Sequence, residues 1–531
     1  MGGGPPVAGS AARSDLRGGS ERRDRGDPCL VAVAGVALLL LFAAGCATSQ
    51  APSAGVDTGG EEARGDVRVE AWESSDDGAR ALDRVQMGGA GGATAVDAAT
   101  VRAATVRITI EPDRRYQAML GFGAAITDAS AWLIRHRMSP AQRGALLRDL
   151  FGRADGGLGF DFTRLTIGAS DFSRSHYSLD DMPAGQVDPE LRRFSIERNR
   201  DDVIPVVREA LAINPGLKVM ASPWSAPGWM KTSGSLVSGS LLPRWYEAFA
   251  RYLVRYVDAY AAEGIPIFAL TLQNEPAFEP DDYPGMRLPA AARARIIGDH
   301  LGRMLAARAP RVQIFDWDHN WDQPEQPLAV LRDPQAAPYV AAVAWHCYGG
   351  DVAAQSRVHA AFPDRDVYMT ECSGGDWEPV RSGGIVGQVR GLVIGATRHH
   401  ARGVLFWNLA LDERRGPHAG GCDTCRGVVT IDSASGRVAR TEDYYALAHA
   451  SRFVRPGARR IGSSEGRDEV DNVAFRNADD GSLVLVASNA ARAPRRLAVE
   501  AGDQGAFVHV LPARSVATFV WHPSRRQGAA R

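Results

Sequence analysis

The chain contains 531 residues, of which 45% are hydrophobic and 23% are charged, and its formal net charge is −1 at pH 7. That length and that apolar fraction allow a full hydrophobic core and more than one structural unit. The balanced charge argues against nucleic acid or an anionic surface as a partner, so we expect a neutral ligand.

The N-terminus has the features of an export signal. A basic stretch around Arg22 precedes an uncharged apolar run at residues 30–45, which is too short for a comfortable transmembrane helix. Small residues precede Cys46, as in a bacterial lipobox, so we predict a signal over residues 1–46 and lipidation of Cys46. We expect a cell-envelope lipoprotein, whose only membrane contact is this anchor; free secretion is the alternative.

Residues 47–103 are rich in Gly, Ala, Ser, Asp and Glu and contain few aromatic residues. Such a composition buries too little apolar surface to fold, so we predict a flexible linker. The organised part begins within residues 104–118, where Val106–Ile110 alternates apolar and polar residues as a half-buried strand does.

Strand-like and helical runs alternate over residues 119–447. The predicted strands are Gly121–Ile126, Phe162–Gly168, Leu217–Ser222, Ile267–Gln273, Val312–Asp316, Val340–His346, Val367–Thr370 and Val404–Trp407. Helical periodicity occurs at Pro140–Phe151, Asp201–Ile213, Leu242–Ala262, Ala290–Ala309 and Gln388–His399. This pattern predicts the α/β class and a (β/α)₈ TIM barrel, in which the carboxyl ends of all strands face one cleft.

The pattern changes over residues 448–525, where short strands are separated by turn residues such as Asp479–Gly481. The predicted strands are Val470–Arg476, Ser482–Ser488, Arg496–Glu500, Phe507–Leu511 and Ser515–Val520. We therefore predict an appended β-sandwich domain, followed by a tail over residues 526–531.

Two glutamates stand at the ends of predicted barrel strands, Glu275 after the fourth strand and Glu371 after the seventh. A surface charge at the start of a loop is the alternative interpretation. Hydrolysis of a glycosidic bond requires two carboxyl groups in one cleft, one as acid/base and one as nucleophile. Asn274, directly before Glu275, offers an amide for a sugar 2-OH. A general acid also needs a raised pKa, which we expect burial and the charge of Glu371 to give Glu275.

Aromatic residues recur near the ends of several other predicted strands. They are Trp224, Trp229, Trp317, Trp345, Tyr348, Trp377 and Trp407. Each alone is more often a core residue, but together at strand ends they favour a carbohydrate cleft, because indole faces stack on sugars.

Five motifs resemble glycoside hydrolase family 30, the glucosylceramidase family. They are Gly121–Asp128, Ala221–Pro227, Gln273–Pro276, His346–Tyr348 and Phe406–Leu411, and they occur in that family's order. The resemblance implies that Glu275 is the acid/base and Glu371 the nucleophile. It further implies sugar-holding roles for Asp128, Trp224, Asn274 and Trp407, and it places Arg164, His346 and Tyr348 around the nucleophile. In that family the sandwich is built from both chain ends, so we expect residues 104–118 to pair into it.

The resemblance implies a retaining β-glycoside hydrolase with a β-glucoside, a glycolipid or a β-glucan as substrate. Glucosylceramidase-like β-glucosidase activity is our leading hypothesis, and endo-β-1,6-glucanase activity is the alternative, ahead of β-xylosidase or β-fucosidase activity. A non-catalytic carbohydrate-binding protein is a further hypothesis. Two positions depart from the family: Phe406 stands in place of a common Asp, and Cys347 in place of Trp.

The cysteines give two further expectations. Cys422 and Cys425 have no second cysteine or histidine pair at zinc-finger spacing, so we predict a local disulfide in an exported protein. We interpret Cys347 and Cys372 as buried thiols. No metal or organic cofactor is implied.

Overall fold

The computed structural model describes residues 68–87, 106–308, 311–376 and 384–523. The predicted signal with Cys46, most of the predicted linker, Trp377 and the tail over residues 526–531 lie outside these ranges. Within the described ranges, no helix combines the length and the apolar character needed to cross a membrane.

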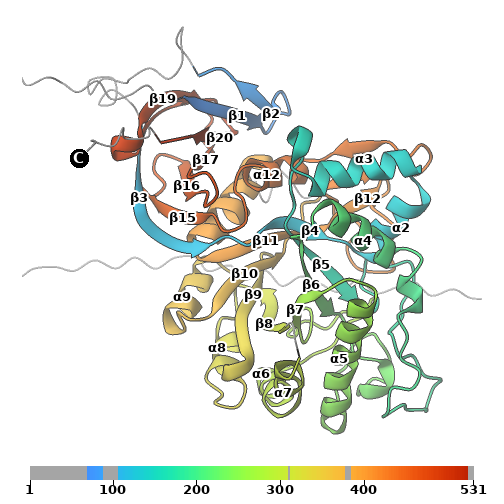
Figure 1. Cartoon of the computed structure of the whole chain (residues 1–531). Helices are drawn as coiled ribbons and strands as arrows, with labels where there is room; N and C mark the ends of the chain where they lie inside the picture. Colours follow the sequence, from blue (N-terminus) through green and yellow to red (C-terminus); the bar gives the residue numbers. More distant parts are fainter. Residues whose placement is uncertain (1–67, 88–105, 309–310, 377–383, 524–531) are drawn as a thin grey trace, which may run out of the picture. The chain divides into compact units, whose positions relative to one another are not determined.

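Eight parallel strands form the barrel, in the order β4-β11-β10-β9-β8-β7-β6-β5 (Figure 1). The strands are β4 (Gly121–Ala125), β5 (Phe162–Ile167), β6 (Lys218–Pro223), β7 (Ile267–Thr271), β8 (Gln313–Asn320), β9 (Val340–His346), β10 (Asp366–Glu371) and β11 (Ala401–Asn408). The N–H of Ile126 donates to the carbonyl of Arg164 at 3.0 Å and brings the β4 and β5 edges together. The predicted TIM barrel is thus confirmed. Both faces of its strands are covered, as in β5, where every residue is buried, including the polar Thr163, Arg164 and Thr166.

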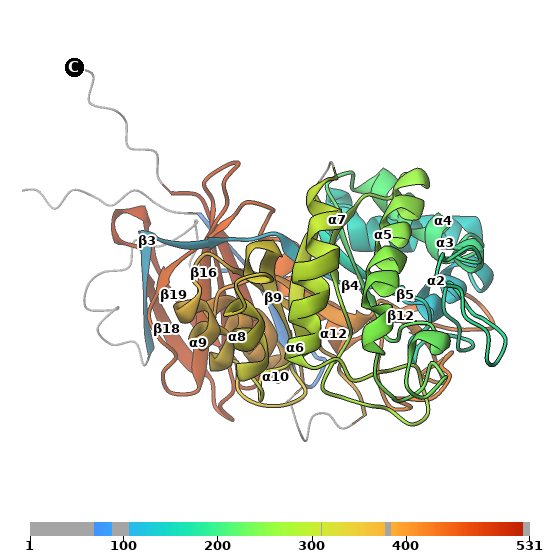
Figure 2. The same ribbon diagram turned by 90° about the horizontal axis from the view of Figure 1, so that it is seen from below.

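Helices surround the barrel strands (Figures 1 and 2). They are α2 (Asp128–His136), α3 (Pro140–Phe151), α4 (Val203–Ile213), α5 (Tyr246–Ala262), α6 (Ala290–Arg295), η5 (Ile296–Leu301), α7 (Gly302–Ala306), α8 (Glu325–Leu331), α9 (Ala353–Ala361), α10 (Gly384–Gln388), η7 (Val389–Gly395), α11 (Ala396–Arg398) and α12 (Glu442–Ser451). In α5 the buried positions include Phe249, Tyr252, Tyr256 and Tyr260, whose spacing of three to four residues is that of one helix face. That apolar stripe anchors α5 on the barrel.

The second domain is a β-sandwich with the strand order β19-β18-β3-β15-β16-β17-β20-β1-β2. Its strands are β1 (Val69–Ser75), β2 (Ala81–Val85), β3 (Val106–Ala118), β15 (Arg459–Ser463), β16 (Val470–Arg476), β17 (Leu483–Asn489), β18 (Arg495–Glu500), β19 (Ala506–Leu511) and β20 (Ser515–Trp521). The early strand β3 pairs with β15 and β18, so both chain ends build the domain as expected. A small sheet of β12 (Ala410–Asp412), β13 (Val429–Ile431) and β14 (Val438–Arg440) follows the last barrel strand.

The prediction of a flexible linker over residues 47–103 is wrong for β1 and β2. Strand β1 pairs along its whole length with β20, and Ala71 is fully buried in the sandwich core. The ring of Trp72 packs against Phe453 with centroids 4.4 Å apart. The polar composition of the whole segment concealed this short apolar stretch, which is stable only because the late strand β20 offers it an edge.

Candidate active site

Glu275 and Asp318 lie at the carboxyl ends of neighbouring strands in strained backbone conformations. Glu275 has φ 50° and Asp318 has φ 54°, in the left-handed region that side chains other than glycine rarely adopt. The N–H of Glu275 donates to the carbonyl of Asp318 at 3.0 Å and links the two segments. Such conformations cost about 1–3 kcal/mol each and persist where the surrounding packing enforces them, often at active sites.

Glu371 ends strand β10 and faces Glu275 across a cavity of about 450 Å³. One carboxylate oxygen of each glutamate and one ring nitrogen of His346 all lie within 4.8 Å of one another. Retaining glycosidases hold their two carboxyl groups about 5–5.5 Å apart, whereas inverting enzymes need about 6.5–9.5 Å to admit a water. The spacing therefore fits a retaining mechanism.

Arg164, on β5, connects the acidic groups of the site and is completely buried. Its guanidinium donates to Glu371 Oε2 at 2.5 Å, Asn274 Oδ1 at 2.7 Å and Asp318 Oδ2 at 2.7 Å. Burial disfavours the charged form, but the carboxylates of Asp318 and Glu371 outweigh it and raise the pKa of Arg164. Because the Asn274 oxygen accepts from Arg164, its amide NH₂ is left as the donor for a ligand.

His346 lies between two carboxylates, with Nδ1 3.1 Å from Glu275 Oε1 and Nε2 3.0 Å from Asp318 Oδ1. Burial disfavours its charged form, yet the charges of Glu371, Asp318 and Glu275 raise the pKa of His346 to about 9. At neutral pH the ring is an imidazolium that donates from both nitrogens. Burial opposes the charge of Asp318 as well, but Arg164 and His346 hold the pKa of its carboxyl well below the usual range.

The pKa values of the two glutamates shift in opposite directions. Burial raises the pKa of Glu371, and the charges of Glu275 and Asp318 add to that rise against the opposing His346 and Arg164. Burial also acts on Glu275, but the hydrogen bond from His346 and nearby positive charges lower its pKa. The expectation that Glu275 has a raised pKa is therefore wrong for the protein without substrate, because its imidazolium partner was not visible in the sequence.

Two of the predicted sugar-binding aromatic residues line the cavity, Tyr348 and Trp407. The Tyr348 hydroxyl donates to Glu371 Oε1 at 2.9 Å, so the nucleophile candidate is held by both Tyr348 and Arg164. Trp224 stacks on Trp407, with centroids 4.8 Å apart and an interplanar angle of 17°. The Arg164 guanidinium lies 4.7 Å from the Trp224 centroid, which ties this aromatic pair to the charged groups.

Asp128, for which a sugar-holding role is predicted, begins helix α2 and is buried. It forms an ion pair with Arg174, at 3.1 Å between Asp128 Oδ1 and Arg174 Nε, and it accepts a hydrogen bond from the Arg174 backbone N–H. Asp171, which the sequence analysis missed, lines the cavity together with the two glutamates. Its signal was an acidic residue in the loop directly after the second barrel strand.

Asp171 is buried, and its Oδ1 has no hydrogen-bond partner among the described residues. Burial, followed by the charges of Glu371 and Glu275, raises the pKa of Asp171 to about 8. The group is therefore a neutral carboxylic acid at pH 7. An unpartnered polar atom beside the catalytic pair is a ready hydrogen-bond partner for a sugar hydroxyl.

The remaining aromatic residues have other roles. Trp317 and Trp345 are core residues, at 1% and 0% exposure, and Trp229 packs edge-on against Trp245. Phe406, one of the two departures from the family pattern, is also buried in the core. Phe278, three residues after Glu275, was missed: it is 46% exposed and lines the cavity mouth with Tyr348.

Two disulfides lie at the site. Cys422 and Cys425 are linked, with Cα atoms 5.6 Å apart, and both line the cavity. Cys347 and Cys372 are also linked, so their interpretation as buried thiols is wrong. They directly follow His346 and Glu371, which are partners in the register of β9 and β10, and this pairing brings the two Cα atoms within 5.4 Å.

Glu275, His346 and Glu371 are spaced so that they could hold a metal ion. The positive charges of Arg164 and protonated His346 oppose a cation there, and each of these three side chains already has a protein partner. The geometry favours acid–base and nucleophilic chemistry.

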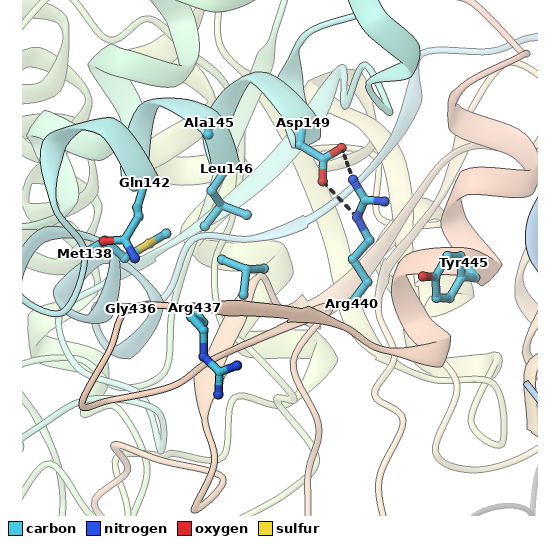
Figure 3. Close-up of a pocket in the computed structure, with 10 residues that line it drawn as sticks. Met138, Gln142, Ala145, Leu146, Asp149, Gly436, Arg437, Arg440 and Tyr445 are labelled. Carbon is cyan, nitrogen blue, oxygen red and sulfur yellow. Dashed lines mark hydrogen bonds and ion pairs between the residues drawn. The ribbon is translucent and has the colours of Figure 1, made fainter.

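A different cavity, of about 610 Å³, lies between helix α3 and strand β14 (Figure 3). Its lining contains one carboxylate, Asp149, which accepts from Arg440 Nη2 at 2.8 Å. Without a second carboxylate this cavity does not offer the two-carboxylate chemistry.

Comparison with known proteins agrees with this geometry. The model of the glycosyl hydrolase family 30 TIM-barrel domain matches residues 119–454, and that of the family's beta sandwich domain matches residues 457–519. An endo-1,6-beta-D-glucanase of Neurospora crassa is 36% identical over 434 residues, which cover 78% of this chain and 88% of that protein. The lysosomal acid glucosylceramidase of Mus musculus is 30% identical over 448 residues, covering 79% and 84%. The solved structure of the endo-beta1,6-glucanase BT3312 has a TM-score of 0.75 and 32% identity, covering 86% of this chain and 99% of that one.

Proposed function

Because the chain belongs to glycoside hydrolase family 30, we propose that it hydrolyses β-1,6-linked glucan and cleaves within the polymer. Retaining β-glycoside hydrolysis follows from the family; the substrate and the endo action are the proposal. The glucanase relatives support it, and so does the form of the cavity mouth.

In the retaining mechanism Glu371 attacks the anomeric carbon while Glu275 donates its proton to the leaving oxygen. Water, deprotonated by Glu275, then attacks the glycosyl-enzyme, and Glu371 leaves as a carboxylate. Without substrate the pKa directions favour the proton on Glu371. The positive charge that develops at the anomeric carbon favours ionised Glu371, so we infer that a proton shared by the coupled pair moves to Glu275 when the sugar reacts.

The exposed aromatic residues at the cavity mouth carry the substrate proposal. Among the described residues, the exposed large hydrophobic side chains are Val187, Phe278, Tyr348, Val438 and Val510. Phe278 and Tyr348 are the two of these that line the cavity. Two separate rings suit the stacking of successive glucosyl units, whereas a ceramide needs a broad apolar surface.

A product profile tests the proposal. On β-1,6-glucan we expect short oligosaccharides early in the reaction, with little free glucose. Release of glucose alone from the start would show exo action. Glucosylceramide is the second candidate, supported by the glucosylceramidase relatives, and faster turnover of it than of β-1,6-glucan would replace the proposed substrate.

A substitution of Phe278 tests the role of the exposed aromatic rings directly. Phe278→Ala should raise KM for β-1,6-glucan about tenfold, because one stacking contact with a sugar is lost. Its KM for an aryl β-glucoside, which occupies less of the mouth, should change little. Val510→Ala, an equally exposed position in β19, is the matched control.

We also propose that the protein is exported and anchored through Cys46. The apolar run before Cys46 supports this, and so do the disulfides, because such bonds persist in oxidising compartments. Cys46→Ser should move the protein from the membrane fraction to the soluble fraction without loss of activity on a soluble substrate. Unchanged membrane association would contradict the anchor.

A further inference from the structure

A cavity of about 710 Å³ lies at the opposite end of the barrel from the catalytic glutamates. Its lining joins helices α9, η7 and α11 to strands β3 and β15 of the sandwich, and it contains His399 and His400. These histidines directly precede β11, whose other end carries Trp407 of the active site. The position at the amino ends of the strands separates this cavity from the chemistry.

Arg460, on β15, is a buried cation without a counter-ion. Its side chain lines the cavity although the residue is only 6% exposed. Nε donates to Gln117 Oε1 at 3.1 Å, and the guanidinium lies 3.4 Å from the centroid of the Tyr116 ring. No carboxylate among the described residues forms an ion pair with it. Burying an unpaired cation is unfavourable, so the cavity lacks a negative charge that would compensate it.

A second guanidinium adds to this positive charge. Arg398 lines the same cavity and donates to Ser463 Oγ at 3.0 Å and to the carbonyl of Asn472 at 2.9 Å. These are neutral acceptors, and within the described part of the chain Arg398 also has no ion pair. Burial has the larger effect and lowers the pKa of Arg398, whereas the carboxylates of Glu465 and Asp471 raise it, so its positive charge is offset only in part.

The adjacent histidines report the same imbalance. Burial, followed by the charges of His359, Arg460 and His399, lowers the pKa of His400 to about 4. Burial also lowers the pKa of His399; the charge of Asp351 opposes that shift, and the charges of Arg398 and Arg460 add to it. Both rings are neutral near pH 7 and offer hydrogen bonds in place of charge.

The acidic residues in the lining form no direct ion pair with Arg398 or Arg460 within the described part of the chain. Asp471 accepts from Arg390 Nε at 2.5 Å and so neutralises a different cation. Glu465 is exposed and forms no ion pair within the described residues. The lining therefore carries three arginines and two carboxylates, an excess of one positive charge.

We propose that this cavity binds a phosphate group, with the terminal nitrogens of Arg460 holding two of its oxygens and Arg398, His399 and His400 around it. A guanidinium is a planar fork that fits two oxygens of one oxyanion. The volume exceeds that of a bare phosphate ion, which leaves room for an attached sugar. Free phosphate and a phosphorylated sugar share this chemistry.

Calorimetric titration of the full chain at fixed ionic strength tests the site, with inorganic phosphate and glucose 6-phosphate as probes. Both should bind the wild-type protein at millimolar concentration or below. Tighter binding of glucose 6-phosphate would identify a phosphorylated sugar as the ligand, and equal binding would identify the phosphate ion. No heat and no shift of the unfolding midpoint with either probe would overturn the proposal.

Arg460→Gln should raise Kd for both probes at least about tenfold, since a charge-assisted hydrogen-bond pair is lost. Arg496→Gln, an exposed arginine in the same domain, is the matched control and should bind like the wild type. Both variants should keep the kcat of the glycosidase, because the cavity is remote from the glutamates. Equal Kd values for Arg460→Gln and the wild type would contradict the assignment.

A measurement on the wild-type chain covers the case in which Arg460→Gln does not fold. Phenylglyoxal modifies accessible guanidinium groups, and mass spectrometry locates the adducts. Phosphate should slow the modification of Arg460 and Arg398 at least severalfold and leave that of Arg496 unchanged. Equal slowing at all three arginines, or at none, would overturn the proposal.

Discussion

The two ends of the barrel differ in whether their buried charged side chains form ion pairs. At the carboxyl end, Glu371 and Asp318 contact Arg164, and His346 contributes a second positive charge between Glu275 and Asp318. At the amino end, Arg398 and Arg460 line a cavity and form no ion pair among the described residues, whereas Arg390 in the same lining pairs with Asp471. Buried charges that form ion pairs hold the catalytic side chains in place and set their pKa values. Buried cations that form no ion pair can instead bind an anion. The catalytic end should therefore be far more sensitive to the loss of a single group.

The largest effect is expected at the nucleophile. Glu371→Ala should lower turnover by several orders of magnitude on every substrate, because no leaving group replaces a missing nucleophile. Glu275→Ala should keep formation of the glycosyl-enzyme with a dinitrophenyl glucoside, whose leaving group needs little protonation. Azide should then accelerate release and yield the β-glycosyl azide. Equal losses in both variants on all leaving groups, without azide rescue, would show that the roles are wrongly assigned.

The charge balance itself is tested at Arg164. Arg164→Met leaves Glu371 and Asp318 buried without their shared cation, so the free energy of unfolding should fall by about 3–5 kcal/mol. Arg308→Met is the control, since Arg308 pairs with the carboxylate of Asp258 at 2.7 Å and the two side chains are 34% and 53% exposed. There the loss should be about 1 kcal/mol or less. Urea unfolding of both variants measures the difference, and similar losses would contradict the importance of burial.

A smaller effect is expected from the disulfide beside the nucleophile. Cys347 and Cys372 join the chain next to Tyr348 and Glu371, which are themselves hydrogen-bonded. Replacing both cysteines by Ser should lower kcat about tenfold with little change in KM, because Tyr348 then holds the nucleophile less rigidly. In a plot of kcat against pH, the acidic limb should also shift. If only the thermal stability falls and the pH profile is unchanged, the disulfide has a structural role alone.

The smallest effect on activity is expected at Asp171, the carboxylic acid of the site that has no cationic partner among the described residues. Because its folded pKa is raised to about 8, its contribution to stability is complete below the unfolded value near 4 and is lost as pH rises through 8. Asp171→Asn should remove that decline and keep most of the activity at pH 6, since an amide resembles the protonated acid. Urea unfolding between pH 5 and pH 9 measures this, and an unchanged decline in the variant would contradict the shifted pKa.

The barrel, the strands of the sandwich and the strand-end positions of Glu275 and Glu371 were all predictable from the order of residues along the chain. Alternating strands and helices dictate a parallel barrel, and a parallel barrel brings the ends of all its strands to one face. The pairing of two glutamates 96 positions apart therefore followed from chain order. The disulfide of Cys422 and Cys425 was also predictable, because it is local.

Contacts between segments far apart in the chain select the loop residues that complete the site and set their pKa values. The place of Asp171 in the cavity depends on the path of the loop that follows β5. The contact between Arg164 and Glu371 joins residues 207 positions apart. The lowered pKa of Glu275 and the link between Cys347 and Cys372 depend on neighbours placed by the register of β9 and β10. Distances between side chains set these properties, and periodicity along the chain carries no information about such distances.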